Sequence, residues 1–484
     1  MKKILYSVCI LLAVSCTKFD DALYDSSPIA KQSIGPVYKE LADLIDDNGW
    51  WFWAQEVSSD EVVFPVRGTD WNDGGKWRVL HQHAWTNDVD AVNSMWSHLF
   101  DGVREANKLL DVLSDQKGDP LVAVDIAKIK TLRAFFMYLA MDNYGDIPII
   151  TSFVNAPPLP FKAERKEVYE FLINDLKPIV SLLPISTNKF AVSRGMAYSL
   201  MAKLYLNAEV YTGTPAYSEA EAMCDSVIGL GTYILQNDVT SAFAADNVNV
   251  PENIFTIAFD EFDNTGFRLH MRTLHYLHDA TFNMKVGPWN GFAILKDHYD
   301  NYEDDDLRKN DWFIVGQQKD VNGTDLFDET AGTKLVIDPY IPKLVMDASN
   351  TPNEIRNSGA RVKKYEIESG ALENLNNDFP LFRYADILLM KAECAVRNGS
   401  PGDGDEWFNL IRQRANISAI AGANLDDILE ERGRELFCEG HRRQDLIRFG
   451  KFGDAWWEKS PSGPDKTTFP IPQWAIDANP NLSL

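Results

Sequence analysis

The feature that most constrains the fold of this chain lies near its end, where acidic and basic residues interleave with apolar ones over residues 428–450. Glu431, Glu435 and Glu439 recur at every fourth position, which places them on one face of a helix. Like charges at this spacing repel each other, so such a helix needs cations from elsewhere in the fold. Because apolar residues separate the charges, we predict a partly buried carboxylate–guanidinium network in preference to a solvated helix end.

Arginines in other apolar helical segments are the candidate partners of these carboxylates. We predict that the network includes Arg133, Arg194 and Arg383, each of which begins or leads a separate segment. Arg434, Arg442, Arg443 and Arg448 are close to the acidic stripe in the sequence. A network of this kind would tie distant helices together, which is a structural role.

The same stretch resembles a family signature. It reads E-R-x-x-E-L-x-x-E-G-x-R-x-x-D-L-x-R-x-G from Glu431 to Gly450 and is similar to the C-terminal signature of the SusD/RagB family. Members of that family are surface lipoproteins that bind nutrients for outer-membrane transporters in Bacteroidota. Four more blocks resemble the family in the family's order, at residues 132–149, 193–206, 382–395 and 469–484, although Ala475 replaces the usual Glu of the last block.

The expected fold is mainly α-helical. Helical periodicity of apolar residues predicts helices at residues 89–113, 125–144, 166–183, 193–211, 217–228, 384–397, 405–414 and 426–439. At about 150 residues per domain, the length of 484 residues suggests three domains. The resemblance implies instead a single domain over residues 31–484, a superhelix of pairs like those of tetratricopeptide repeats. Minor β-hairpins and two long irregular loop excursions, residues 58–88 and 232–380, complete this expectation.

The start of the chain predicts export and a lipid anchor. Lys2 and Lys3 precede an apolar run that is too short for a membrane span of about 20 residues, so residues 1–15 read as a signal peptide. Small residues before Cys16 resemble a lipoprotein signal, and we predict that Cys16 is lipidated and that residues 16–30 form a tether. Ordinary cleavage that leaves Cys16 free is the alternative. The resemblance implies a place on the outer membrane, facing the exterior.

Charge and cysteine usage exclude several classes of partner. The formal net charge of −24 argues against nucleic acid and against adhesion to anionic lipid, so a membrane would be reached only through the anchor. Cys224, Cys394 and Cys438 are far apart and lie in apolar helical segments, which predicts small core residues in place of a disulfide or zinc framework.

The first excursion gathers the residue types that recognise sugars. Flat rings stack on the C–H face of a pyranose, and neighbouring polar groups bind its hydroxyls. We therefore predict a ligand site there; a local core formed by the same aromatic residues is an equally weighted alternative. The predicted ligand-binding residues of this excursion are Trp71, Asp73 and Trp77, followed by Arg67 and Asp70.

The second excursion contains candidate residues for the opposite side of the same ligand site. Trp289 and Asn290 stand on a turn between Gly287 and Gly291, and we predict that both contact ligand. Tyr276 and Trp312 are weaker candidates. The competing interpretation is a tryptophan that fills the helical frame.

Catalysis, metals and cofactors are not expected. A glycosidase needs two facing carboxylates, and Asp60, Glu61, Asp70 and Asp73 are present, but the chain carries none of the common catalytic motifs. His81 and His83 would need further ligands to hold a metal. The acidic run at 303–306 could hold Ca²⁺, although a solvated turn is the better interpretation.

The function that the resemblance implies is binding without bond cleavage. The chain would capture an oligosaccharide and pass it to a SusC-like TonB-dependent transporter. Two alternatives remain within the same family. The ligand could be a peptide, or the protein could be a structural lid with little affinity of its own.

Overall fold

The computed structural model describes residues 26–46, 49–114, 116 and 118–483. The predicted signal peptide, Cys16 and most of the predicted tether lie outside these residues. The fold is mostly helical, as the sequence predicts. In the part of the chain that is described, none of the helices is both long enough and apolar enough to cross a membrane.

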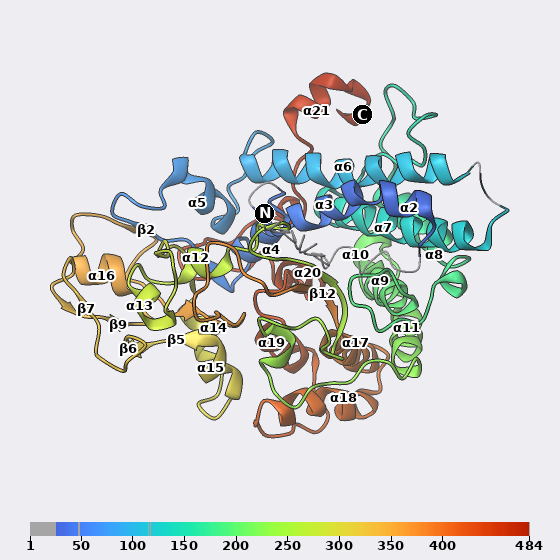
Figure 1. Cartoon of the computed structure of the whole chain (residues 1–484). Helices are drawn as coiled ribbons and strands as arrows, with labels where there is room; N and C mark the ends of the chain where they lie inside the picture. Colours follow the sequence, from blue (N-terminus) through green and yellow to red (C-terminus); the bar gives the residue numbers. More distant parts are fainter. Residues whose placement is uncertain (1–25, 47–48, 115, 117, 484) are drawn as a thin grey trace, which may run out of the picture.

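Long helices pack in pairs and form the frame of the molecule (Figure 1). Successive helices α6 and α7, α9 and α11, and α17 and α18 pack against each other, and α11 also packs on α17, which links the pairs. This arrangement confirms the predicted helix pairs. The frame helices are α6 (Asp90–Ser114), α7 (Pro120–Tyr144), α8 (Arg165–Leu176), α9 (Arg194–Leu206), α11 (Tyr217–Gly229), α17 (Tyr384–Arg397), α18 (Pro401–Arg414) and α19 (Leu425–Glu435).

Helix α7 is the central element of one end of the frame. Asp119 caps it and Pro120 starts it, a combination that favours helix initiation. From residue 131 to its end at Tyr144 every side chain is buried, so the helix is covered on all sides and not on one face only. Helices α6, α8 and α9 pack around it.

Shorter helices lie at the start of the described residues, between the frame helices and within the excursions. Helices α2 and α3 lie along α6 (Figure 1). The short helices are α2 (Pro28–Ser33), α3 (Gly35–Asp43), α4 (Trp51–Val57), α5 (Lys76–His81), α10 (Ala208–Thr212), α12 (Leu269–Thr273), α13 (His278–Phe282), α14 (Lys296–Asp300), α15 (Leu307–Trp312), α16 (Pro352–Asn357), α20 (Arg442–Arg448) and α21 (Gln473–Ala478).

The strands form two-stranded sheets that mostly join distant segments. Among the described residues only β7 and β8 make a local hairpin, and β2 pairs with β10 in parallel while the other pairs are antiparallel. The pairs are β1 (Val62–Val63) with β4 (Ala293–Ile294), β2 (Val66–Arg67) with β10 (Val345–Met346), β3 (Asn253–Ile257) with β12 (Phe379–Arg383), β5 (Phe313–Ile314) with β11 (Arg361–Val362), β6 (Gly316–Gln317) with β9 (Val336–Ile337), and β7 (Phe327–Asp328) with β8 (Thr333–Lys334).

Three predicted helix boundaries are wrong for identifiable reasons. The helix expected to reach residue 183 ends as α8 at Leu176, because Pro178 has no backbone N–H to continue the helical hydrogen bonds. The helix expected over 193–211 is broken at Asn207, whose side chain donates to the Lys203 carbonyl. The helix expected to reach Glu439 ends at Glu435, since Cys438 and Gly440 have positive φ angles of 56° and 78°.

The predicted network exists and lies in the interior. Glu431, Glu435 and Glu439 are each at most 1% exposed, and each accepts hydrogen bonds from cationic side chains. Arg383 bridges two of the carboxylates, with 2.6 Å from Nη1 to Glu435 Oε1 and 2.7 Å from Nη2 to Glu439 Oε1. Glu431 and Glu435 share α19, whereas Glu439 lies beyond its end.

Two of the proposed partners lie elsewhere, so the sequence-based assignment of Arg133 and Arg194 to this network is wrong. Arg133 on α7 donates to Asp175, 2.5 Å away, which ties α7 to α8. Arg194 starts α9 and donates to the carbonyls of Ser181 and Leu183. Both arginines join helices, but they serve the opposite end of the frame.

Cations from α15 and α18 take the places that these arginines were expected to fill. Arg308 Nη1 lies 2.8 Å from Glu431 Oε1 and 3.0 Å from Glu435 Oε2. Arg412 and Arg414 on α18 donate to Glu431 and Glu435, respectively. Burial opposes ionisation, but Arg308 with Arg434 and Arg412 outweighs it and lowers the pKa of Glu431 to about 2. The carboxylates therefore stay charged and matched, as buried charges must.

Candidate functional site

The structure brings the two excursions together beside α4, α5 and α12 (Figure 1). Strand β1 pairs with β4, so Val62 lies opposite Ile294, and β2 pairs with β10, so Val66 lies opposite Val345. The turn that carries Trp71 follows β2, and the turn that carries Trp289 precedes β4. Residues more than 200 positions apart in the chain thereby meet at one place.

Arg67 fastens this junction from inside and is not available to a ligand. Its side chain is 3% exposed, and its donors reach the carbonyls of Gly291 at 3.2 Å, Ile355 at 2.9 Å and Ser358 at 3.0 Å. Burial lowers its pKa to about 10. The prediction that Arg67 contacts ligand is wrong, because the guanidinium already donates to three carbonyls in two segments of the second excursion.

Asn290 has the same supporting role. It is fully buried, accepts from Arg361 Nη2 at 2.7 Å and donates to the Arg356 carbonyl at 3.0 Å. The predicted ligand contact of Asn290 is therefore wrong as well. Its amide satisfies buried groups of the second excursion and holds the turn beneath Trp289.

Trp71 and Trp289 are held as a pair, and both remain partly exposed. The indole Nε1 of Trp71 donates to the Trp289 carbonyl at 2.9 Å. The Trp71 ring lies against Gly291 so closely that a Cβ on that glycine would be 2.5 Å from the ring. Trp71 itself has a φ of 62°, which is uncommon for a bulky residue.

Trp77 lies beneath this pair, in the core. It is 2% exposed and stacks on Phe64, with ring centroids 3.9 Å apart and planes at 15°. Its Nε1 donates to Asp73 Oδ2 at 2.9 Å. The prediction that Trp77 binds ligand directly is wrong, because α5 turns it inward together with Leu80. Trp312, the weaker candidate, is also fully buried.

Tyr276 and Asp70 lie together at the edge of the junction. The Tyr276 hydroxyl donates to Asp70 Oδ2, and the Arg356 guanidinium lies 4.7 Å from the centroid of the tyrosine ring. Burial and this carboxylate raise the pKa of Tyr276 to about 12, so the phenol stays protonated. Asp70, Asn72 and Asp73 are exposed.

Arg272 on α12 is a contributor that the sequence did not reveal. It is 7% exposed, and its guanidinium lies 5.4 Å from the Trp289 ring, 6.0 Å from Trp71 and 5.2 Å from Trp53. A cation placed among indole rings attracts all of them. No residue pattern around Arg272 marks it, since only the tertiary fold assembles these rings.

We call Trp71, Tyr276 and Trp289 the aromatic platform. Its three rings are partly exposed, come from both excursions and are held by the Trp71–Trp289 and Tyr276–Asp70 hydrogen bonds. The exposed carboxylates of Asp70 and Asp73 adjoin it. Flat apolar rings beside hydrogen-bonding groups can bind a ligand with both an apolar face and hydroxyls.

Asp60 and Glu61, two of the four carboxylates considered for a hydrolase, are engaged by or buried among other residues of the chain. Asp60 accepts both Arg442 Nε at 2.7 Å and Nη2 at 2.9 Å, which ties the first excursion to α20. Glu61 is 1% exposed; burial and the neighbouring Glu56 raise its pKa well above the usual range.

The acidic run at 303–306 is engaged by cations of the protein. Asp306 is fully buried and accepts from Arg308 Nη2 at 2.8 Å, while Asp304 pairs with Lys309. The Asp306 side chain caps α15. These contacts give the run a structural role.

A cavity of about 320 Å³ lies away from the platform, on the frame between α6 and the segment after α7. Phe100, Phe153 and Ile150 contribute its apolar lining, and Asp101, Arg104 and Asn107 are polar. The sequence contained no signal for it, since its residues belong to two separate segments.

Comparison with known proteins identifies the family. A family model described as "SusD family" matches residues 343–468, and one described as "Starch-binding associating with outer membrane" matches residues 46–206. SusD-like protein P25 from Formosa agariphila is 30% identical and aligns with 99% of this chain and 97% of its own length. The chain belongs to the SusD family.

More distant relatives agree with this assignment. Starch-binding protein SusD from Bacteroides thetaiotaomicron is 24% identical over 89% of this chain and 84% of its own length. Surface glycan-binding protein A from the same species, solved in complex with laminarihexaose, has a TM-score of 0.72 at 22% identity and covers 93% of this chain and 97% of its own. A SusD-like carbohydrate-binding protein from Bacteroides fragilis has a TM-score of 0.76 at 18% identity, covering 95% and 100%. The fold is that of these proteins.

Proposed function

We propose that this protein binds an oligosaccharide on the aromatic platform and catalyses no reaction. The observation that carries the proposal is the pairing of Trp71 with Trp289 across the two excursions, with Tyr276 beside them. Relatives named for starch and laminarihexaose binding support a glycan as the class of ligand.

The platform would recognise a sugar chain through complementary surfaces. Pyranose rings expose C–H faces that stack on indole and phenol rings, and their hydroxyls donate to carboxylates. Asp70 and Asp73 would accept these hydrogen bonds, while Arg67, Asn290 and Trp77 hold the platform from below. Because the supporting groups are already bonded, little rearrangement would be needed when the ligand binds.

We further propose that the protein acts at the outer membrane as a lipoprotein. Residues 1–15 would be removed, Cys16 would carry the lipid, residues 16–30 would form the tether, and residues 31–484 would be one domain that faces the exterior. The description of the matching family, starch-binding and associating with the outer membrane, supports this location. The body would hand its oligosaccharide to a SusC-like TonB-dependent transporter.

The anchor is tested separately from the ligand. A Cys16→Ala variant should leave washed outer membranes and appear in the soluble fraction, as judged by immunoblotting of both fractions. Retention of the variant in washed membranes would contradict lipid anchoring and would leave the ligand site untouched.

A binding panel tests the ligand class. The purified protein is titrated calorimetrically with laminari-oligosaccharides, malto-oligosaccharides and basic peptides, and each incubation is assayed for new reducing ends. The proposal expects saturable binding of at least one oligosaccharide series and no increase in reducing ends. Binding of peptides only, steady release of reducing ends, or no binding to an expanded glycan array would each overturn it.

A second location for the ligand is the cavity beside Phe153. If a glycan binds and Trp71→Ala leaves its affinity unchanged while Phe153→Ala lowers it, the ligand occupies that cavity on the frame and not the platform.

A further inference from the structure

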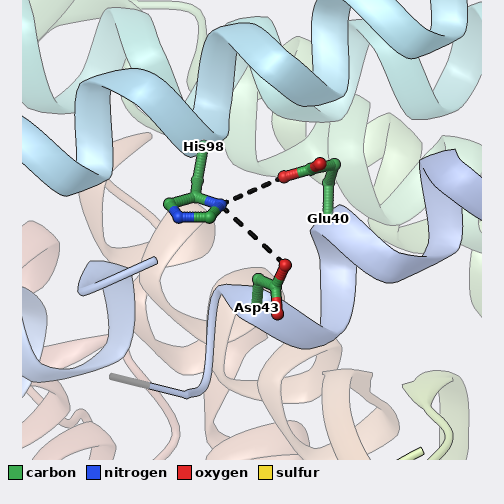
Figure 2. Close-up of side chains that lie close together, drawn as sticks. All are labelled: Glu40, Asp43 and His98. Carbon is green, nitrogen blue, oxygen red and sulfur yellow. Dashed lines mark hydrogen bonds and ion pairs between the residues drawn. The ribbon is translucent and has the colours of Figure 1, made fainter. Parts of the chain in front are cut away.

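A histidine and two carboxylates converge at the contact between α3 and α6, outside the aromatic platform and the charged network (Figure 2). Glu40 and Asp43 are three positions apart on α3 and therefore share a face of that helix. His98 projects from α6 toward both. One ligand atom of each residue lies within 4.8 Å of the others, and the described part of the chain holds no other such set of three or more His, Cys, Asp or Glu.

The distances fit a common ion. His98 Nδ1 lies 3.1 Å from Glu40 Oε2 and 3.9 Å from Asp43 Oδ2. Nitrogen and oxygen ligands lie about 2.0–2.2 Å from a zinc ion, so neighbouring ligand atoms in such a site are separated by about 3–4 Å. Both distances from His98 fall in this range, and the Glu40 and Asp43 oxygens lie within 4.8 Å of each other.

The site also has access to solvent, as an exchangeable ion requires. The side chains of His98, Glu40 and Asp43 are 24%, 14% and 11% exposed. The other seven histidines of the chain are buried, each at most 8% exposed. Cys224, Cys394 and Cys438 are buried as well. In the described structure, His98 is therefore the imidazole most open to an ion from solution.

We propose that Glu40, Asp43 and His98 bind a divalent first-row transition ion, of which zinc is the representative. An imidazole ligand selects ions of this class over Ca²⁺ and Mg²⁺, which prefer oxygen ligands throughout. Three protein ligands leave at least one coordination position for water. The ion fastens α3 to α6, and with it the first helices of the chain to the frame.

One competing cation is visible. Lys39 Nζ lies 2.5 Å from Asp43 Oδ2, in a side chain that is 67% exposed. Because a surface ion pair of this kind contributes little and a lysine this exposed can move into solvent, the ion displaces it. Removing the lysine should consequently tighten metal binding.

The test is a calorimetric titration with Zn²⁺ alone, using protein purified without a polyhistidine tag. The wild type should take up one equivalent with saturation, and excess Zn²⁺ should raise its melting temperature. His98→Gln and Glu40→Gln should each weaken binding at least tenfold and abolish the thermal shift, whereas Lys39→Ala should strengthen binding severalfold.

The matched control is Asp101→Asn. Asp101 lies three residues after His98 on α6 and pairs with Arg104, so this variant removes a nearby carboxylate without touching the three ligands. Asp101 acts on His98 only through space, so the Zn²⁺ affinity of this variant should stay within about twofold of the wild type. Circular dichroism of each variant establishes whether it is folded. If His98→Gln does not fold, the Zn²⁺ affinity of Glu40→Gln is the test.

Three results would overturn the proposal. They are absence of saturable Zn²⁺ uptake by the wild type, unchanged affinity in folded His98→Gln and Glu40→Gln, and equal affinity for Ca²⁺. The first of these would leave an ion pair between His98 and the two carboxylates, a contact that only joins the helices.

Discussion

The charged network around α19 and the aromatic platform on the excursions differ in burial and in whether their polar groups are paired within the chain. In the network, Glu431, Glu435 and Glu439 are buried, and their oxygens are engaged by arginine and lysine of the same chain. On the platform, Trp71 and Trp289 are partly exposed, and Asp70 and Asp73 face solvent. The network is complete without a ligand, whereas the platform presents rings and carboxylates to one.

This difference separates charge density from function. A stripe of glutamates looks like an active site in a sequence, but here each carboxylate serves to hold α15, α18 and α19 together with β12. Buried ion pairs add little net stability, yet removing one partner leaves the remaining charges buried and unpaired. The loops carry the accessible chemistry because their supporting groups are bonded below the surface.

Acid should distinguish the two regions most strongly. Burial lowers the pKa of His81, His270 and His275 to about 4, and six of the seven buried histidines belong to the excursions 58–88 and 232–380. Unfolded histidine binds protons below about pH 6.5 and the folded residue does not, so stability is lost as pH falls from 6.5 toward 4. At about pH 4, each histidine whose pKa is lowered this far costs about 3 kcal/mol of folding stability.

As pH falls, the network should keep its structure to a lower pH than the excursions do. The pKa of Glu431, lowered to about 2, gives a contribution that is present above about pH 4.5 and is lost only as pH falls toward 2. Hydrogen exchange followed by mass spectrometry at pH 7.5 and 5.0, corrected for intrinsic rates, should show loss of protection in the excursions before α17 and α19. Equal loss in both regions would contradict this order.

Glu435→Ala should be the most costly single substitution in the network. It leaves Arg308, Arg383 and Arg414 without a shared buried partner, and losses of about 3–5 kcal/mol are typical of such changes. Denaturant unfolding measures the loss, and the folded fraction should still bind ligand. Glu430→Ala, on the same helix but partly exposed, is the control and should cost less than about 1 kcal/mol. Lost binding with unchanged stability would place the ligand site in the network.

Trp77→Ala should destabilise the protein, although Trp77 is only six residues from Trp71. Removing a buried ring that stacks on Phe64 should cost about 3–5 kcal/mol, measured by thermal and denaturant unfolding. Trp474→Ala is the matched control, since that ring is 48% exposed and its loss should be within about 0.5 kcal/mol. Similar stability of the two variants would contradict the assignment of Trp77 to the core.

Tyr276→Phe should have the smallest effect. It keeps the ring of the platform and removes the hydrogen bond to Asp70, so ligand affinity should fall by about 0.5–1.5 kcal/mol with stability nearly unchanged. Tyr340→Phe, at an exposed tyrosine in the same excursion, should alter neither quantity. A stability loss equal to that of Trp77→Ala would show that Tyr276 belongs to the core.

The sequence was informative where a pattern has a physical period. Amphipathic repeats predicted the frame helices, and α17 was placed at Tyr384–Arg397, where the structure has it. Arg383 was found because it precedes a recognisable helix. Arg308 was missed since it follows an acidic run that resembles a solvated turn, and only the fold brings α15 to α19.

The site was harder to predict because burial depends on distant contacts. Trp71 and Trp77 look alike in the sequence, and Arg67 looks like a residue that contacts ligand until β2 places it against three carbonyls. One signal for Trp77 was present: Trp77 and Leu80 are three residues apart at the start of α5, which is the spacing of a buried helical face. Asn290 and Arg272 had no such signal.

The most direct test of the account compares ligand binding by Trp71→Ala with that of the wild type. The titration uses the oligosaccharide that the binding panel identifies, and thermal melts of both proteins accompany it. The account predicts an affinity loss of about 1 kcal/mol or more, because a stacking ring is removed, while the frame and its network remain folded. Unchanged affinity in folded Trp71→Ala would contradict the claim that the aromatic platform is the ligand site.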